Sequence, residues 1–201
     1  MARDSNEAIN SYISDMLALE DHIEKAIRGQ LADLKEYPTV AAELKGFHRT
    51  VEHHIADLKA LSDRRQAGGV AEALKRAGSI VAGAAAGLID LVRTEGLPKN
   101  LRDDYTAFNL ATIGYIMLHT TATSLEDQEV SELARQHFRD YAEAVMRLNS
   151  LIPAAVVRYL QLAGLPARDG VVDQINRTVE EGWKQTAHAP GVNEPVSARQ
   201  L

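Results

Sequence analysis

The sequence contains no cysteine, and this absence narrows the chemistry open to the chain. Disulfide bridges, thiolate zinc sites, iron–sulfur clusters and cysteine nucleophiles all need a cysteine sulfur, so each is excluded. A metal ion would have to be bound by histidine, aspartate and glutamate. Aromatic residues are also scarce at 5%, which leaves alanine, leucine, isoleucine and valine to fill a core and favours helix.

Positive charge is scarce as well, since the formal net charge is -6 and no long basic run occurs. This balance lacks the electrostatic footprint of a nucleic-acid-binding protein, so we expect no nucleic-acid partner. The first residues lack the basic and then apolar pattern of a secretory signal, which predicts a cytoplasmic protein. Phosphate-binding glycine loops and nucleophile-elbow motifs are absent, so the sequence favours a non-enzymatic role.

Apolar residues recur at spacings of three and four along most of the chain, which is the pattern of amphipathic helices. Pro38 suits a first helical turn, so the short break around it predicts two antiparallel neighbouring helices. Ser124 and Asp127 resemble a capping box in front of a later helix. Pro153 is expected to kink that helix or to end its first half. The predicted helices cover about 5–35, 38–64 and 71–93, then one from near Asn100, one after Asp127 and one over 171–183.

Two predicted hairpins are separated by roughly thirty residues, and this long connection bears on the topology. A single long crossover between hairpins predicts an all-α, ferritin-like four-helix bundle, whereas an up-down-up-down bundle needs only a short loop there. The same layout also fits an ordinary bundle of five or six helices. We expect the bundle to cover residues 1–165, with a crossover helix at about 70–95, and a C-terminal helix and loose tail to cover 166–201.

The glycine-rich segment around residues 78–89 has a small-xxx-small pair in Gly83 and Gly87. The uncharged run between Arg76 and Asp90 is shorter than the roughly 20 residues that span a bilayer. We therefore expect no transmembrane segment, and tight helix packing is favoured over attachment of this helix to a membrane surface.

The centres of the first two helices repeat a pattern, apolar-Glu-x-His-Ile, around Glu20 and Glu52. Counted from the predicted turn near Tyr37, the two glutamates differ in level by about 3 Å at 1.5 Å per residue. The same counting on the second hairpin brings Asp140 level with the segment Phe108 to Ala111. Carboxylate-bridged di-iron or di-manganese sites need acids and imidazoles from four facing helices, and the third helix supplies no acid here.

Several segments resemble the YciE/YciF-type ferritin-like stress proteins over roughly residues 8 to 150. They are Asp15-Met-Leu-Ala-Leu-Glu-Asp-His-Ile23, His53-His-Ile-Ala-Asp-Leu58 and Tyr115-Ile-Met-Leu-His119, followed by Leu125-Glu-Asp and Glu132-Leu133. The resemblance implies metal ligands at Glu20, His54 and Asp140, with Glu52 close by. It also implies a stress-linked role and a homodimer. The family's third-helix glutamate falls on Ala111, so the implied di-metal centre is incomplete.

These observations predict a ferritin-like, stress-associated protein with an incomplete di-metal site and a structural or interaction role. A working di-iron or di-manganese oxidase, or an iron-handling protein, is the alternative, with iron or manganese as the cofactor. A bundle associated with a membrane surface through the glycine-rich helix is the third reading.

Overall fold

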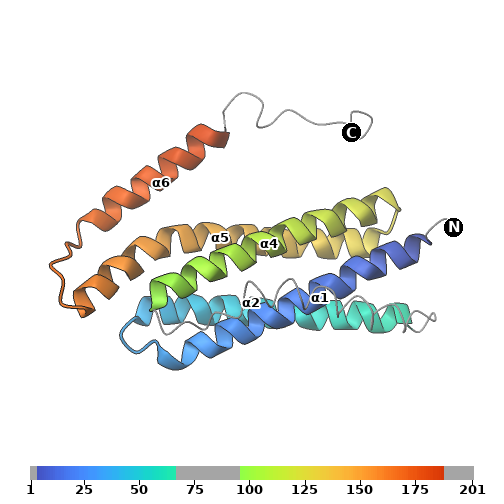
Figure 1. Ribbon diagram of the computed structural model, residues 1–201. Coiled ribbons are helices and arrows are strands. Elements are labelled where there is room, and N and C mark those ends of the chain that lie inside the picture. Colours follow the sequence, from blue (N-terminus) through green and yellow to red (C-terminus); the bar gives the residue numbers. More distant parts are fainter. Residues whose placement is uncertain (1–3, 67–95, 188–201) are drawn as a thin grey trace. The chain divides into compact units, whose positions relative to one another are not determined.

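The computed structural model describes residues 4–66 and 96–187, and within these ranges the chain forms helices and no strand (Figure 1). The all-α prediction is therefore confirmed for the described part. The predicted crossover helix at 70–95 and the tail after 187 lie outside it. The helices are α1 (Ser5–Gln30), the short 3₁₀ helix η1 (Leu31–Asp33), α2 (Pro38–Gln66), α4 (Leu97–Ser124), α5 (Gln128–Leu162) and α6 (Val171–Ala187).

The chain divides into two compact units, Met1–Leu148 and Asn149–Leu201. The division falls inside α5, whereas the sequence places a boundary at residues 165–166. The first unit contains α1, α2, α4 and the first part of α5, and the second contains the rest of α5 and α6. Each unit is described by itself below.

Helix α1 begins at a cap and ends earlier than the pattern predicts. The Asp4 carboxylate accepts a hydrogen bond of 3.2 Å from the backbone N–H of Asn6, which satisfies one of the free donors of the first turn. The helix ends at Gln30 and tightens into η1, and Pro38 then starts α2. One face of α1 is apolar and buried, with Ile9, Ile13, Met16, Leu19, Ile23 and Ile27.

The turn between α4 and α5 is capped differently from the predicted capping box. Helix α4 continues through Ser124, so this residue caps nothing. The Asp127 side chain instead accepts a bond of 3.1 Å from the N–H of Val130 and caps α5. The carboxylate of Asp127 also pairs with Arg65 at 2.5 Å, which fixes the turn against α2.

Pro153 lies inside α5, and the helix runs on to Leu162. Of the two outcomes predicted for Pro153, a kink or an end of the first half of the helix, the end is therefore wrong. Proline removes one backbone hydrogen bond and costs about 3 kcal/mol within a helix. Apolar side chains are buried on both sides of it, namely Leu148, Leu151, Ala155 and Val157, and this burial offsets the loss.

Side-chain contacts give the relative directions of the helices in the first unit. Arg65 near the end of α2 bonds to Asn10 near the start of α1, so these helices are antiparallel. Gln30 at the end of α1 bonds to Asp104 near the start of α4, so this pair is antiparallel too.

Helices α2 and α5 are also antiparallel, because their ion pairs run in opposite order along the two helices. Arg64 near the end of α2 pairs with Glu129 at the start of α5, and Glu43 near the start of α2 pairs with Arg147. Both α2 and α4 are thus antiparallel to α1 and run in the same direction. The last turn of α2 and the first turn of α4 consequently lie at opposite ends of the helices.

The second unit ends α5 with a glycine and continues into an amphipathic helix. Gly164 has a φ of 76°, and the N–H of Leu165 bonds to the carbonyl of Leu160, which together form a left-handed helix end that favours glycine. Helix α6 follows and has no buried residue, and its tryptophan, Trp183, is 46% exposed. The predicted helix over 171–183 is confirmed and extends to Ala187. No helix in the described ranges is long and apolar enough to cross a membrane.

Candidate functional site

A cluster of polar side chains is buried at the level where α1, α2, α4 and α5 face one another. Glu20 and His54 are fully buried in a core that is otherwise mostly apolar, and His137 is 2% exposed. Two tyrosines from α4 and α5, Tyr115 and Tyr141, complete its centre. Polar groups at such depth are costly unless each is hydrogen-bonded.

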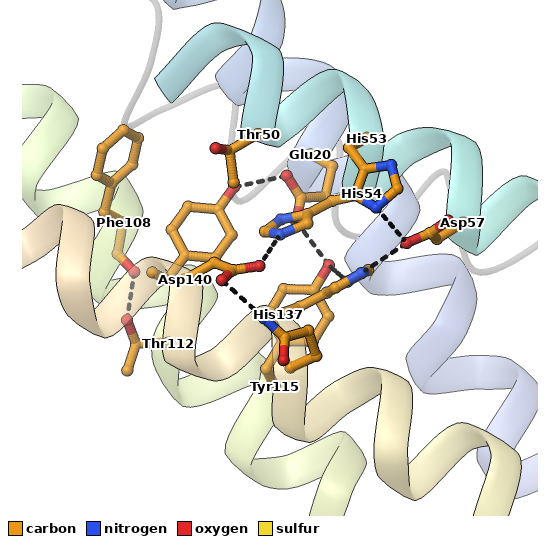
Figure 2. A network of polar contacts seen from close by, with 12 residues as sticks. Glu20, Thr50, His53, His54, Asp57, Phe108, Thr112, Tyr115, His137 and Asp140 are labelled. Atoms are coloured by element: carbon orange, nitrogen blue, oxygen red, sulfur yellow. Dashed lines mark hydrogen bonds and ion pairs between the residues drawn. The ribbon is translucent and has the colours of Figure 1, made fainter. Parts of the chain in front are cut away.

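The Glu20 carboxylate is the hub of this cluster (Figure 2). The Tyr115 hydroxyl donates to Oε1 over 2.6 Å, and the Tyr141 hydroxyl donates to Oε2 over 2.5 Å. Nδ1 of His54 lies 3.1 Å from Oε1 as a further donor. Short bonds of this kind to a charged acceptor are the strong ones. Burial, together with the negative charge of Glu20, raises the pKa of both phenols well above the usual value, so both remain protonated donors.

Two His-x-x-Asp segments, His54–Asp57 on α2 and His137–Asp140 on α5, bond to each other reciprocally. Nε2 of His54 lies 3.1 Å from Oδ2 of Asp140, and Nε2 of His137 lies 3.3 Å from Oδ2 of Asp57 (Figure 2). Each histidine therefore bonds to the aspartate of the other helix. The two arrangements are related by approximate twofold symmetry, because α2 and α5 are antiparallel.

The other ring nitrogens of the two histidines face Glu20 and the tyrosine that bonds to it. Nδ1 of His54 faces Glu20, and Nδ1 of His137 lies 3.0 Å from the Tyr115 hydroxyl. The two imidazole rings stack with centroids 3.8 Å apart and planes 21° apart. Glu20 of α1 thus lies next to Nδ1 of His54 in the way that Tyr115 of α4 lies next to Nδ1 of His137.

This stack can carry one positive charge but not two. Burial lowers the pKa of His54, but the hydrogen bonds and charges of Glu20 and Asp140 outweigh burial, and the net shift is upward. Burial and the charge of His54 lower the pKa of His137 to about 4. The histidine between two carboxylates is therefore the protonated one, and its stacked partner is neutral.

The same arrangement suits a metal ion. Glu20, His54 and His137 each bring one ligand atom to within 4.8 Å of the other two. Metal-bound histidines usually donate their second ring N–H to a carboxylate, which orients the ring and makes the ligand nitrogen more basic. Asp140 and Asp57 are placed to accept those bonds through the two Nε2 atoms. Nδ1 of the neutral His137 then has a free lone pair for a cation, and His54 can offer its own after losing one proton. Two imidazoles with a carboxylate and an adjacent phenol form a donor set for a transition metal.

Three of the four predicted ligands lie in this cluster. Glu20, His54 and Asp140 are joined directly, with His54 between the two acids. Asp140 bonds to Nε2 of His54, so in this geometry it orients the histidine and is not itself a metal ligand. Metal binding by the predicted set stays a prediction.

The fourth predicted ligand, Glu52, lies elsewhere. Its side chain is 56% exposed and lies on another face of α2 than His54. Oε2 of Glu52 is 3.3 Å from Nδ1 of His48. Nε2 of His48 is 2.8 Å from Glu24, and these three residues form a second group whose ligand atoms lie within 4.8 Å of one another. Arg28 pairs with the same Glu24 oxygen at 3.3 Å, so that carboxylate already has a cationic partner.

The sequence reasoning overlooked His137, Asp57 and the role of Tyr115. The signal was the His-x-x-Asp spacing that occurs once in each hairpin, because it places a histidine and an acid one helical turn apart. The predicted gap in the third helix is present, since Ala111 is fully buried and offers no ligand. Tyr115, one turn further along α4, faces the cluster instead.

A pocket of about 490 Å³ opens between α2 and α5 beside the cluster. Asp140 and Tyr141 line its inner wall, so it reaches residues that contact His54 and Glu20. Phe47 and Phe108 contribute aromatic surface next to them. This size is in the range of pockets that bind small molecules.

No protein-family model matches the chain, and neither a curated protein nor a solved structure shows significant similarity to it.

Proposed function

We propose that this chain is a ferritin-like four-helix bundle with an incomplete di-metal centre, which binds one transition-metal ion in a structural role. The ligands are Glu20, His54 and His137, with the Tyr115 oxygen next to them. The single observation that carries the proposal is the reciprocal pairing of two histidines with two aspartates. It leaves Nδ1 of His54 facing the buried Glu20 and Nδ1 of His137 facing the Tyr115 hydroxyl, which bonds to the same glutamate.

The directions of the helices support the ferritin-like part of the proposal. Parallel α2 and α4, with the end of one and the start of the other at opposite ends, require one long crossover rather than a short loop. The contacts of Arg65 with Asn10 and of Gln30 with Asp104 carry this inference.

The donor inventory favours one ion rather than two. Two cations at close range need bridging carboxylates from facing helices, and the only glutamate of the buried cluster is Glu20. On α4 the nearest positions are Ala111, which has no ligand atom, and Tyr115, which has a single oxygen. Iron or manganese fits the mixture of imidazole and oxygen donors.

The role is proposed to be structural because the donors close around the ion from four helices. Structural metal sites are fully enclosed by protein ligands, whereas catalytic ones keep a coordination position open. An ion that binds the folded chain and not the unfolded chain would raise the stability of the fold by mass action. The stress-linked role and the homodimer that the resemblance implies belong to the same proposal.

Metal analysis of protein purified from cells supplemented with iron and manganese tests the proposal. We expect one ion per chain in the wild type, and at least about tenfold lower occupancy in His137→Gln because a ligand is removed. The matched control is His119→Gln, since this histidine bonds to Ser131 and lies outside the ligand set. Two ions per chain, no bound ion, or unchanged occupancy in His137→Gln would contradict it.

A further inference from the structure

The pocket between α2 and α5 owes its volume to small residues on both helices. Gly46 lacks a side chain, and the space where its Cβ would lie has no neighbour within 4 Å. Ala144 faces the pocket from α5, and Thr50 lines it from α2, one helical turn from Gly46. Larger side chains at these positions would fill the gap, so the pocket follows from the sequence.

The floor of the pocket is aromatic. Phe108 packs edge to face against Phe47 at 5.4 Å and against Tyr141 at 5.3 Å between ring centroids. Phe47 is 7% exposed and has the most accessible surface of the three rings, while Phe108 and Tyr141, at 1% and 2%, line the pocket only at their edges. Such rings favour another flat aromatic ring in stacked or edge-to-face contact.

The inner wall offers a hydrogen-bond acceptor. Asp140 has a side chain that is 31% exposed, with Oδ2 bonded to His54 and Oδ1 accepting from Gln136 over 3.0 Å. An ionised carboxylate has about four acceptor positions, and these two bonds fill half of them. A donor on a molecule in the pocket can use the rest.

The rim carries charges that largely neutralise each other. Arg147 pairs with Glu43 at 3.3 Å and with Glu143 at 2.9 Å. These residues all line the pocket, together with the exposed Arg49. With Asp140 the rim and wall hold three acids and two arginines, a near balance that favours a neutral ligand over an ion.

From these features we propose that the pocket binds a small, neutral aromatic molecule that carries an O–H or N–H donor. The ring packs against Phe47 and the edges of Phe108 and Tyr141, and the donor bonds to the Asp140 carboxylate. The site is separate from the proposed metal ligands and needs no ion to be formed, so it can be tested whether or not metal binds.

A pair of matched probes tests the proposal, 4-methylphenol and 4-methylanisole, which differ by methylation of the hydroxyl. Titration of the full chain, followed by amide chemical shifts or calorimetry, should give affinity for the phenol about tenfold higher than for the ether. Asp140→Asn should reduce this preference to about twofold or less. Equal affinity for the two probes, or no binding of the phenol, would overturn the proposal.

Two pocket-filling variants localise the binding. Ala144→Phe and, separately, Thr50→Met place bulk in the pocket and should weaken binding of 4-methylphenol at least about tenfold, with thermal unfolding measured to select the variant that stays folded. His119→Gln changes a histidine that does not line the pocket and should retain binding. Undiminished binding in a folded filling variant would place the probe elsewhere and refute the site.

Discussion

Asp104 is a buried carboxyl group near the start of α4, and within the described ranges 4–66 and 96–187 its hydrogen-bond donor is the side chain of Gln30, at 2.8 Å. Burial raises its pKa from 3.8 to about 7, against the lowering effect of Gln30 and with a small further rise from Asp103. Oδ2 of Asp104 and Oε1 of Gln30 are both buried with no hydrogen-bond partner among the described residues. A proton on the acid removes the cost of burying its charge.

Replacing this acid by its amide is therefore expected to change the pH dependence of stability. The pKa is higher folded than unfolded, so the stabilising contribution is fully present below about pH 4 and is lost as pH rises through about 7. Between pH 5 and pH 8 the free energy of unfolding of the wild type should therefore fall by roughly 2–3 kcal/mol relative to that of Asp104→Asn. Denaturant titrations at both values measure the difference. Asp21→Asn, at an exposed position, should show no such difference, and parallel curves for Asp104→Asn and wild type would contradict the assignment.

For single residues, the sequence predicts the height along the bundle axis better than the direction in which each side chain points. Counting from the turns places Glu20 close to the second helix and Asp140 close to Phe108, and the ring of Tyr141 does contact Phe108. The rotation of each helix, which is set by packing of the whole core, decides that His54 faces inward while Glu52 faces solvent. Periodicity in one helix does not contain that information.

Glycines in the interiors of two helices illustrate the element scale. Gly46 on α2 has open space around the position of a Cβ, whereas a Cβ on Gly114 of α4 would lie 2.4 Å from the sulfur of Met16 on α1. Glycine within a helix costs roughly 0.5–1 kcal/mol relative to alanine when nothing else changes. Gly114 therefore allows α1 and α4 to approach closely.

We expect opposite results from the two glycine-to-alanine substitutions. Gly46→Ala should raise the free energy of unfolding by about 0.5–1 kcal/mol, through helix propensity alone. Gly114→Ala should lower it by about 1 kcal/mol, because the buried Met16 side chain has to move. Thermal and denaturant unfolding of the two variants, each against wild type, measure both changes. A gain of the same size in each would show that α1 has room to spare at this contact.

Element ends were the least predictable part of the fold. The start of α1 at Asp4 and the start of α2 at Pro38 follow from local chemistry, since a capping acid and a proline in the first turn act within a few residues. The end of α4 and the passage of α5 through Pro153 do not, because contacts distant in sequence decide them. Asp127, for example, caps α5 while bonding to Arg65 on α2.

The course of the helices can be tested across the whole first unit by cross-linking, because the chain has no cysteine of its own. A cysteine pair at Arg64 and Glu129, whose side chains are 2.7 Å apart, should react readily with a short bifunctional maleimide. A pair at Arg64 and Lys99 should not, because parallel helices of about 40 Å separate these ends. Rapid cross-linking of the second pair would indicate an up-down-up-down bundle and refute the crossover.

At the scale of the whole molecule, the sequence predicts the helices and their hairpins. Short breaks around Pro38 and Asp127 force antiparallel neighbours, and amphipathic periodicity gives the buried faces. The packing of one hairpin on the other depends on contacts across the core, so the sequence does not distinguish a ferritin-like arrangement from other bundles. The division of the chain within α5 also has no local marker, because the helix is continuous there.

The placement of aromatic residues gives each unit its own optical signal. Trp183, the single tryptophan, lies on α6 in the unit Asn149–Leu201. Of the six tyrosines, Tyr159 alone belongs to that unit, and Tyr115 and Tyr141 stack in the core of the other with ring centroids 6.0 Å apart. Near-ultraviolet circular dichroism of tyrosine therefore follows order in the first unit, while tryptophan emission follows the solvent around α6. The unlabelled wild-type chain thus reports the melting of its two units at separate wavelengths.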